Sequence, residues 1–213
     1  MDGHITELIN RYPLLKGCAD DIEQVFFIML ECYMSGGKVL ICGNGGSAAD
    51  AEHWAGELMK GFIDKRPVPA DKMDKLGPEL SEHLQGALPT IPLTGYISLS
   101  TAFANDVNAV YLYSQLVWGL GNEKDVLIGI STSGNAENIL YAMQTAAAKG
   151  MKTIGLSGES GGKMNDISDI CINVPETEVH RIQEYHLPVY HTICLMLEDA
   201  LFGGQQGQCT LSD

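Results

Sequence analysis

The sequence predicts an α/β protein with a single three-layer domain, in which helices flank a five-stranded parallel sheet. Short apolar runs of strand character alternate along the chain with segments of helical periodicity. Such alternation indicates right-handed crossovers between parallel strands. The chain has 213 residues, of which 45% are hydrophobic, and this suits one domain with a sizeable core.

Apolar residues at helical spacing occupy residues 1–35, where Pro13 and Gly17 divide the pattern into two predicted helices. This segment precedes the first strand, and its apolar residues need a partner. We therefore expect an N-terminal helical arm that packs against another subunit. The main domain is predicted over residues 36–204, and a polar tail over 205–213.

A buried strand that ends at Cys42 leads into the loop Gly43–Gly46, and Ser47 then opens an Ala-rich helix. A tight loop between a parallel strand and a helix N-terminus forms an anion site, because its amides and the helix dipole favour negative charge. His53 and Glu57 lie four residues apart on this helix and therefore share a face. The segment predicts an anion site beside a pair suited to acid–base or metal chemistry.

Residues 69–89 interrupt the alternation and are predicted to be an insertion in the domain. A proline-containing loop at 64–69 precedes a polar stretch at 71–88. One interpretation is a solvated surface excursion with a short helix at 78–84. The other is a lid over the site, and the sequence does not choose between them.

The next segment of strand character covers 88–99, and a helix is predicted over 100–120 with Asn105 and Asp106 near its start. The remaining elements are predicted, in chain order, as a strand over 125–130, a helix that ends at Lys149–Gly150, a strand over 152–156, a strand over 169–174 and a helix over 178–202.

A second candidate phosphate loop contains Ser131, Thr132 and Ser133 and runs to Asn135 between a strand and a helix. Its three hydroxyls and the free amides of the helix N-terminus match the oxygens of a phosphate monoester. Ser and Thr are also favoured as helix N-caps, so this segment alone leaves both interpretations open. Two such loops at the carboxyl edge of one sheet favour a phosphate site.

The last predicted helix concentrates polar side chains that could act in catalysis or bind a metal: His180, Gln183, Glu184, His186 and His191. Each histidine alone is more often a surface or hydrogen-bonded residue than a ligand. Together with His53 and Glu57, they make a site of two His, one Glu and one Gln plausible, and this ligand set suits zinc. Pro188 must either kink this helix or lie within its first turn.

Composition argues against several classes of partner. The net charge is −14, which argues against binding of nucleic acid or of anionic membranes. No apolar run approaches the roughly 18 residues of a membrane span, and the N-terminus has no signal-peptide pattern. The six cysteines are scattered without a CxxC pair, which predicts reduced, buried thiols in a cytoplasmic protein.

A loose dinucleotide-binding pattern runs from Gly43 through Gly45 to Ala48. The full pattern expects a second strand that ends in an acid about 20 residues further on. Residues 62–68 form a charged, proline-containing loop instead. A nucleotide-binding oxidoreductase, which would bind NAD, is therefore a minor alternative.

Several segments together resemble the sugar isomerase (SIS) domain and, more narrowly, the phosphoheptose isomerases. The resemblance covers roughly residues 20–202 apart from 69–89. It is carried by Cys42–Ser47, the His53 and Glu57 pair, Asn105–Asp106, Ile130–Asn135, Gly161–Met164 and Arg181–Glu184.

The resemblance implies the SIS fold and an enzyme that interconverts sedoheptulose 7-phosphate and D-glycero-D-manno-heptose 7-phosphate through an enediol. Glu57 would move the proton between C1 and C2, and His191 would be the partner acid. The implied substrate contacts are Asn44, Gly45, Gly46, Ser47, Glu57, Asn105, Asp106, Ser131, Thr132, Ser133 and Gln183.

The resemblance also implies one zinc ion per subunit, held by His53, Glu57, Gln183 and His191. It implies a homotetramer with sites at subunit interfaces, so that Glu57 and His191 could come from different chains. The expected partners are then a small sugar phosphate and further copies of the chain.

Four features depart from the family pattern: Ala136 in place of a phosphate-binding Ser, His180 in place of Asp, Pro188, and the insertion. They bear on the particular sugar more than on the reaction. The alternative function is a non-catalytic sugar-phosphate sensor or protein adaptor. A related branch that binds a replication initiator lacks the second helix histidine, so the presence of His191 favours an enzyme.

Overall fold

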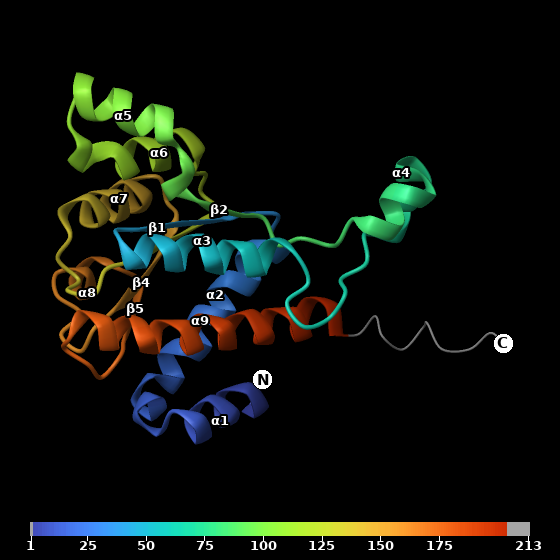
Figure 1. Ribbon diagram of the computed structural model, residues 1–213, viewed down its shortest axis with the longest axis horizontal. Helices are drawn as coiled ribbons and strands as arrows, with labels where there is room; N and C mark the ends of the chain where they lie inside the picture. The colour runs from blue at the N-terminus through green and yellow to red at the C-terminus, as the bar shows by residue number, and fades with distance from the viewer. Residues whose placement is uncertain (1, 204–213) are drawn as a thin grey trace.

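Five parallel strands form the centre of the molecule (Figure 1), and the predicted α/β architecture is confirmed. The computed structural model describes residues 2–203. The strands are β1 Val39–Gly43, β2 Thr90–Pro92, β3 Val126–Ile130, β4 Lys152–Ser157 and β5 Ile170–Asn173, in the sheet order β2-β1-β3-β4-β5.

The register of the central strands brings their carboxyl ends to one level. Gly43 at the end of β1 lies opposite Ile130 at the end of β3, and Ile130 lies opposite Leu156 of β4. Every residue of β1 and β3 is buried, as expected for a parallel sheet that is covered on both faces. The loops that follow β1 and β3 therefore open side by side at the same edge.

Helices cover both faces of the sheet, and each face has its own hydrophobic cluster. One cluster includes Phe26, Trp54 and Tyr190, and the other includes Val117 and Met143. The first face carries α2 (Ala19–Met34), α3 (Gly46–Met59) and α9 (Val179–Phe202), and the second carries α6 (Leu112–Leu120), α7 (Glu137–Ala148) and α8 (Met164–Ile167).

The segment predicted as an N-terminal arm has two different environments. Helix α1 (Asp2–Arg11) lies against α9 (Figure 1), and a 3-10 turn, η1 (Pro13–Cys18), follows it. The first-face cluster contains Ile22, Val25 and Met29, so α2 belongs to the core. The predicted break between two helices at Pro13 and Gly17 is present. The domain boundaries themselves remain predictions.

The strand predicted over 88–99 is too long. Strand β2 has only three residues, after which the 3-10 turn η2 (Leu93–Gly95) leads into α5 (Ile97–Asp106). Pro92 has no N–H with which to continue the ladder, so pairing with β1 stops there.

The single helix predicted over 100–120 is also wrong. Val107 has φ −127° and ψ −90°, which ends α5, and the side chain of Asn108 accepts a hydrogen bond from the Val110 amide to start η3 (Ala109–Tyr111). Helix α6 follows directly. Asn105 and Asp106 therefore lie at the end of α5 and not near a helix start.

The insertion forms α4 (Ala70–His83), which projects clear of the rest of the molecule in Figure 1. Gly77 has φ +75° and ψ 169°, so the helix is broken into two short segments, and the second, which ends at His83, corresponds to the short helix predicted at 78–84. No residue of α4 is buried. The figure places α4 at the end of α3 opposite the β1 loop, as expected for a surface excursion.

Helix α9 continues across Pro188, which is buried in the middle of the helix and not in its first turn. None of the helices within residues 2–203 is long and apolar enough to cross a membrane.

Five cysteines are free and buried: Cys18, Cys32, Cys42, Cys171 and Cys194. Burial raises the pKa of Cys18 and Cys32 to about 11, and the pKa of Cys42 and Cys171 to about 12. The sixth cysteine, Cys209, and the predicted tail at 205–213 lie outside the described residues.

Candidate active site

The loop after β1 makes the tight turn that the sequence predicts. Gly45 has φ +55° and precedes the first residue of α3, and the Ser47 amide donates to the Asn44 carbonyl at 3.0 Å. The hydroxyl of Tyr113 donates to the Gly43 carbonyl at 2.6 Å. A Cβ on Gly43 would lie 2.4 Å from the Ser47 carbonyl oxygen, so only glycine fits this close approach.

Two asparagines join this loop to the start of α7. Asn44 Nδ2 donates to Asn138 Oδ1 at 2.9 Å, and Asn138 Nδ2 donates to Asn44 Oδ1 at 2.8 Å. The sequence reasoning missed Asn138, whose signal was its place in the first helical turn after the Ser131–Asn135 loop. The first candidate phosphate loop is therefore held directly to the helix that follows the second one.

The backbone of the second loop is fixed by its neighbours. The Gly158 amide donates to the Thr132 carbonyl at 3.1 Å, and the Met164 amide donates to the Gly134 carbonyl at 3.0 Å. Ala136 is the N-cap of α7 and provides no side-chain cap. The first turn of α7 thus presents backbone amides beside the hydroxyls of the loop, which is the arrangement of an anion site.

The N-terminal part of α9 also reaches the β1 loop. A Cβ built on Gly46 would lie 2.4 Å from Gln183 Nε2 and 2.8 Å from Gln183 Oε1. The amide of Gln183 therefore lies directly on the N-terminus of α3. This contact brings a predicted substrate and metal residue to the loop from a helix more than 130 residues further along the chain.

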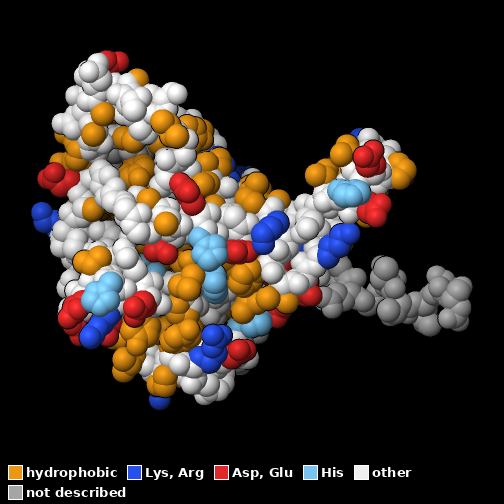
Figure 2. All heavy atoms as spheres, viewed as in Figure 1, with side chains coloured by type: hydrophobic (Ala, Val, Ile, Leu, Met, Phe, Trp, Pro, Cys, Tyr) orange, Lys and Arg blue, Asp and Glu red, His pale blue; other side chains and the backbone are white. Residues whose placement is uncertain are grey.

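His53 connects the two predicted catalytic residues. Its Nε2 lies 3.1 Å from Glu57 Oε1, and its ring centroid lies 5.1 Å from that of His191. Its other nitrogen, Nδ1, lies 2.9 Å from the hydroxyl of Tyr190. Glu57 and His191 therefore flank the same ring within one subunit. On the face shown in Figure 2, histidine side chains gather over α3 and α9 beside acidic and basic ones.

Glu57 is held as a carboxylate. Partial burial alone raises its pKa, but Lys60, whose Nζ lies 2.9 Å from Oε2, and His53 outweigh that effect, so the pKa is lowered from its ordinary value. The sequence analysis does not identify Lys60, although its position three residues after Glu57, at the end of the same helix, indicates that the two side chains are neighbours.

His191 is held as a neutral imidazole. Burial and the neighbouring His53 lower its pKa from the ordinary value, and Glu57 partly opposes this. Its Nε2 is buried and has no hydrogen-bond partner among the described residues. A neutral ring with an unpaired nitrogen can exchange a proton with a ligand.

Other predicted residues lie apart from His53, Glu57 and His191. Asn105 and Asp106 are exposed at the end of α5, where the Asn105 amide donates to Asp106, and α5 packs on η3 and α6. His180 and Glu184 are exposed near the start of α9. His186 is fully buried and faces the Ser157 carbonyl, so it has a core environment.

His53, Glu57 and His191 offer the donor atoms of a zinc site, but they do not form a complete one. Among residues 2–203, no group of three or more His, Cys, Asp or Glu side chains is arranged to hold a metal ion. The His191 ring, however, lies 5.1 Å from the His53 ring, which contacts Glu57, and Nε2 of His191 has no partner among the described residues. This donor set fits the chemistry of zinc.

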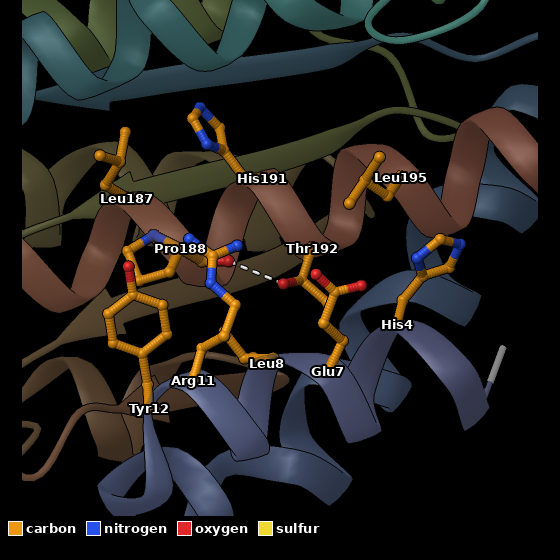
Figure 3. Close-up of a pocket in the computed structure, with 10 residues that line it drawn as sticks. All are labelled: His4, Glu7, Leu8, Arg11, Tyr12, Leu187, Pro188, His191, Thr192 and Leu195. Carbon is orange, nitrogen blue, oxygen red and sulfur yellow. Dashed lines mark hydrogen bonds between the residues drawn. The ribbon is translucent and has the colours of Figure 1, made fainter.

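A groove of about 140 Å³ lies between α1 and α9 and reaches the other side of His191. Figure 3 shows Glu7 and Arg11 of α1 facing α9, whereas His191 points toward the α3 side. The groove therefore borders the cluster without containing His53 or Glu57.

A family model described as the SIS domain matches residues 11–158. The phosphoheptose isomerase of Aneurinibacillus thermoaerophilus is 42% identical over 85% of this chain and 82% of its own. That of Akkermansia muciniphila is 36% identical over 94% of this chain and 96% of its own.

Solved structures agree with these relatives. A phosphoheptose isomerase structure from Neisseria gonorrhoeae superposes with a TM-score of 0.74 at 34% identity, and covers 93% of this chain and 96% of that one. One from Francisella tularensis gives a TM-score of 0.75 at 31% identity, with the same coverage.

Proposed function

The chain belongs to the SIS domain family and, within it, to the phosphoheptose isomerases. We propose that Glu57 and His191 carry out its reaction. It is an aldose–ketose isomerase that acts on a sugar phosphate, namely sedoheptulose 7-phosphate, which it converts to D-glycero-D-manno-heptose 7-phosphate. The observation that supports the assignment of roles is the position of Glu57 and His191 on either side of His53.

Glu57 is the base of this mechanism. Aldose–ketose exchange requires a group that takes a proton from one carbon and returns it to the next, and a second group that handles the proton on oxygen. The lowered pKa of Glu57 keeps its carboxylate ready to accept the carbon-bound proton. The buried Nε2 of His191 serves the substrate oxygen, because that nitrogen has no partner among the described residues.

The two loops position the substrate. We assign phosphate binding to Ser131, Thr132 and Ser133 with the amides of the α7 N-terminus, and sugar hydroxyl contacts to Asn44, Ser47 and Gln183. The asparagine pair fixes the distance between these regions. Binding energy from the phosphate then orients the first two carbons toward Glu57. Asn105 and Asp106 would act on the sugar of a neighbouring subunit.

We propose that His53, Glu57, Gln183 and His191 hold one zinc ion per subunit. A bound zinc ion would polarise the substrate oxygens as a Lewis acid. The residues' own contributions are those described above. We further propose a homotetramer, and a cytoplasmic location on the basis of the free, buried thiols.

Turnover of sedoheptulose 7-phosphate tests the function. The purified protein is expected to form the aldose phosphate, and the variant Glu57→Gln is expected to lose turnover while it keeps phosphate binding. Activity is measured with and without added zinc. Absence of product under both conditions would reject the isomerase, and full activity of Glu57→Gln would reject the base. Recovery of a stoichiometric protein partner with an inactive chain would instead favour the adaptor.

A further inference from the structure

A buried carboxylate on α9 accepts hydrogen bonds from the backbone of the segment that follows α3. Glu198 is 2% exposed, and its two oxygens accept hydrogen bonds from the amides of Phe62 (2.8 Å), Ile63 (2.8 Å) and Asp64 (3.2 Å). The same carboxylate accepts the Nε–H of Arg66 at 2.7 Å. Glu198 therefore fixes the whole turn between α3 and the insertion.

Arg66 extends this connection to the end of α3. Its side chain is fully buried, and Nη1 donates to the Leu58 carbonyl at 2.8 Å, with a longer contact of 3.5 Å from Nη2 to the Glu57 carbonyl. These are carbonyls of the last turn of α3, which have no partner within the helix. The guanidinium thus holds the turn of α3 that carries Glu57.

Glu198 and His191 are seven residues apart on α9, which is close to two full turns, so both face the same side. Phe62, whose amide Glu198 holds, places its ring 5.1 Å from the His191 ring. One buried ion pair is therefore linked to both predicted catalytic residues, through the backbone of Glu57 and through the ring of Phe62.

We propose that Arg66 and Glu198 are positioning residues, which set the placement of Glu57 relative to His191 for the isomerisation. The inference deepens the proposed function and rests on it. It gives a role to two residues that do not touch the substrate.

A merely structural role for the pair is the competing explanation, and the chain contains a matched control for it. Asp125 is 3% exposed and also accepts backbone amides, from Lys38 at 2.9 Å and from Asn122 at 2.7 Å, in addition to the Lys38 ammonium. It directly precedes β3, at the amino edge of the sheet and away from the site. Glu198→Gln and Asp125→Asn therefore make comparable changes, but only Glu198 is bonded to the segment that follows α3.

The experiment compares both variants under conditions in which circular dichroism shows them folded. We expect Glu198→Gln to lower kcat about 100-fold, the cost of misplacing a catalytic group by about 1 Å. Its KM should stay near the wild-type value, because the phosphate loops are anchored elsewhere. Asp125→Asn should change neither constant. Arg66→Lys keeps the positive charge but loses the forked set of guanidinium donors, so it should also lower kcat.

A second measurement does not depend on turnover. In protein with labelled histidine, we expect the ring of Phe62, 5.1 Å from the His191 ring, to shift the His191 resonance, and Glu198→Gln to remove that shift while Asp125→Asn retains it. An unchanged His191 resonance, or equal loss of kcat in Glu198→Gln and Asp125→Asn, would overturn the positioning role. If the wild-type protein has no isomerase activity, the proposed function is rejected instead. The His191 resonance would then still test whether Glu198 holds Phe62 against His191.

Discussion

Because Gly46 has no side chain, the amide of Gln183 can lie against the N-terminus of α3. Gly46→Ala would place a methyl group 2.4 Å from Gln183 Nε2 and must displace that amide. We expect kcat/KM to fall on the order of tenfold to 100-fold, because a substrate-positioning group moves. Gly56→Ala in the same helix is the control, since its Cβ would meet no atom within 4 Å. Equal activity of the two variants would argue against a role for Gln183.

A buried histidine should make stability depend on pH. Burial lowers the pKa of His186 to about 4 from 6.5, so the folded protein excludes a proton that the unfolded chain binds. Its contribution is complete above pH 6.5 and is lost as the pH falls toward 4, by up to about 3 kcal/mol. His186→Leu should flatten this part of the curve in denaturant titrations at several pH values. An identical pH dependence in both proteins would contradict the prediction.

Individual residues were predictable where chemistry and spacing coincide. His53 and Glu57 share a helical face because they are four residues apart, and this alone placed them together. Tyr190, which contacts His53, and Asn138, which pairs with Asn44, contact residues far away in the sequence. The place of Asn138 in the first turn of α7 is a local signal, but its pairing with Asn44 follows only from the packing of α7, as the contact of Tyr190 with His53 follows from that of α9.

At the scale of elements, the strands were predictable and some boundaries were not. β3 is an apolar run and β4 is buried from Thr153 onward, and the positions of both agree with the prediction. The segment 88–120 was misread, because Pro92 stops the edge strand and the Asn108 side chain starts a new turn. Each effect depends on the backbone preference or hydrogen bond of a single residue, which the periodicity of apolar residues does not report.

The insertion should be dispensable for folding. None of the residues of α4 is buried, and the stem below it is closed by hydrogen bonds from the Gly61 amide to Gln85 Oε1 and from the Gly86 amide to the Arg66 carbonyl. Replacement of residues 70–83 by a short Gly/Ser linker should shift Tm by less than about 4 °C. Thermal unfolding and activity are measured together. A folded variant without activity would restore the lid interpretation.

At the scale of the whole molecule, the exposed apolar side chains predict assembly. Ile97 is 76% exposed, Met34 73% and Ile63 71%, and we expect neighbouring subunits of the proposed homotetramer to cover such side chains. We expect light scattering to give four times the mass of one chain. If Asn105 and Asp106 act across an interface, dilution that dissociates the protein should abolish activity in parallel. A fully active monomer would contradict both expectations.

The topology could be predicted because crossovers between parallel strands have one hand, so the alternation of elements restricts the sheet. The strand order then brings the loops after β1 and β3, which are the two candidate phosphate loops, to the same edge of the sheet. The approach of α9 to α3, which unites Glu57 with His191, could not be derived from the residues alone. It depends on Tyr190, Trp54 and the buried pair of Arg66 and Glu198, which become neighbours only in the folded chain.

The burial of Cys18, Cys32, Cys42, Cys171 and Cys194 has a practical consequence for fluorescence work. Maleimide dyes react with the thiolate, and five thiols that are both enclosed and strongly protonated will react slowly. Once Cys209 is replaced, a cysteine introduced on the outer surface of α4 should take up a single dye. The natural protein would then need no further removal of cysteines before single-molecule experiments.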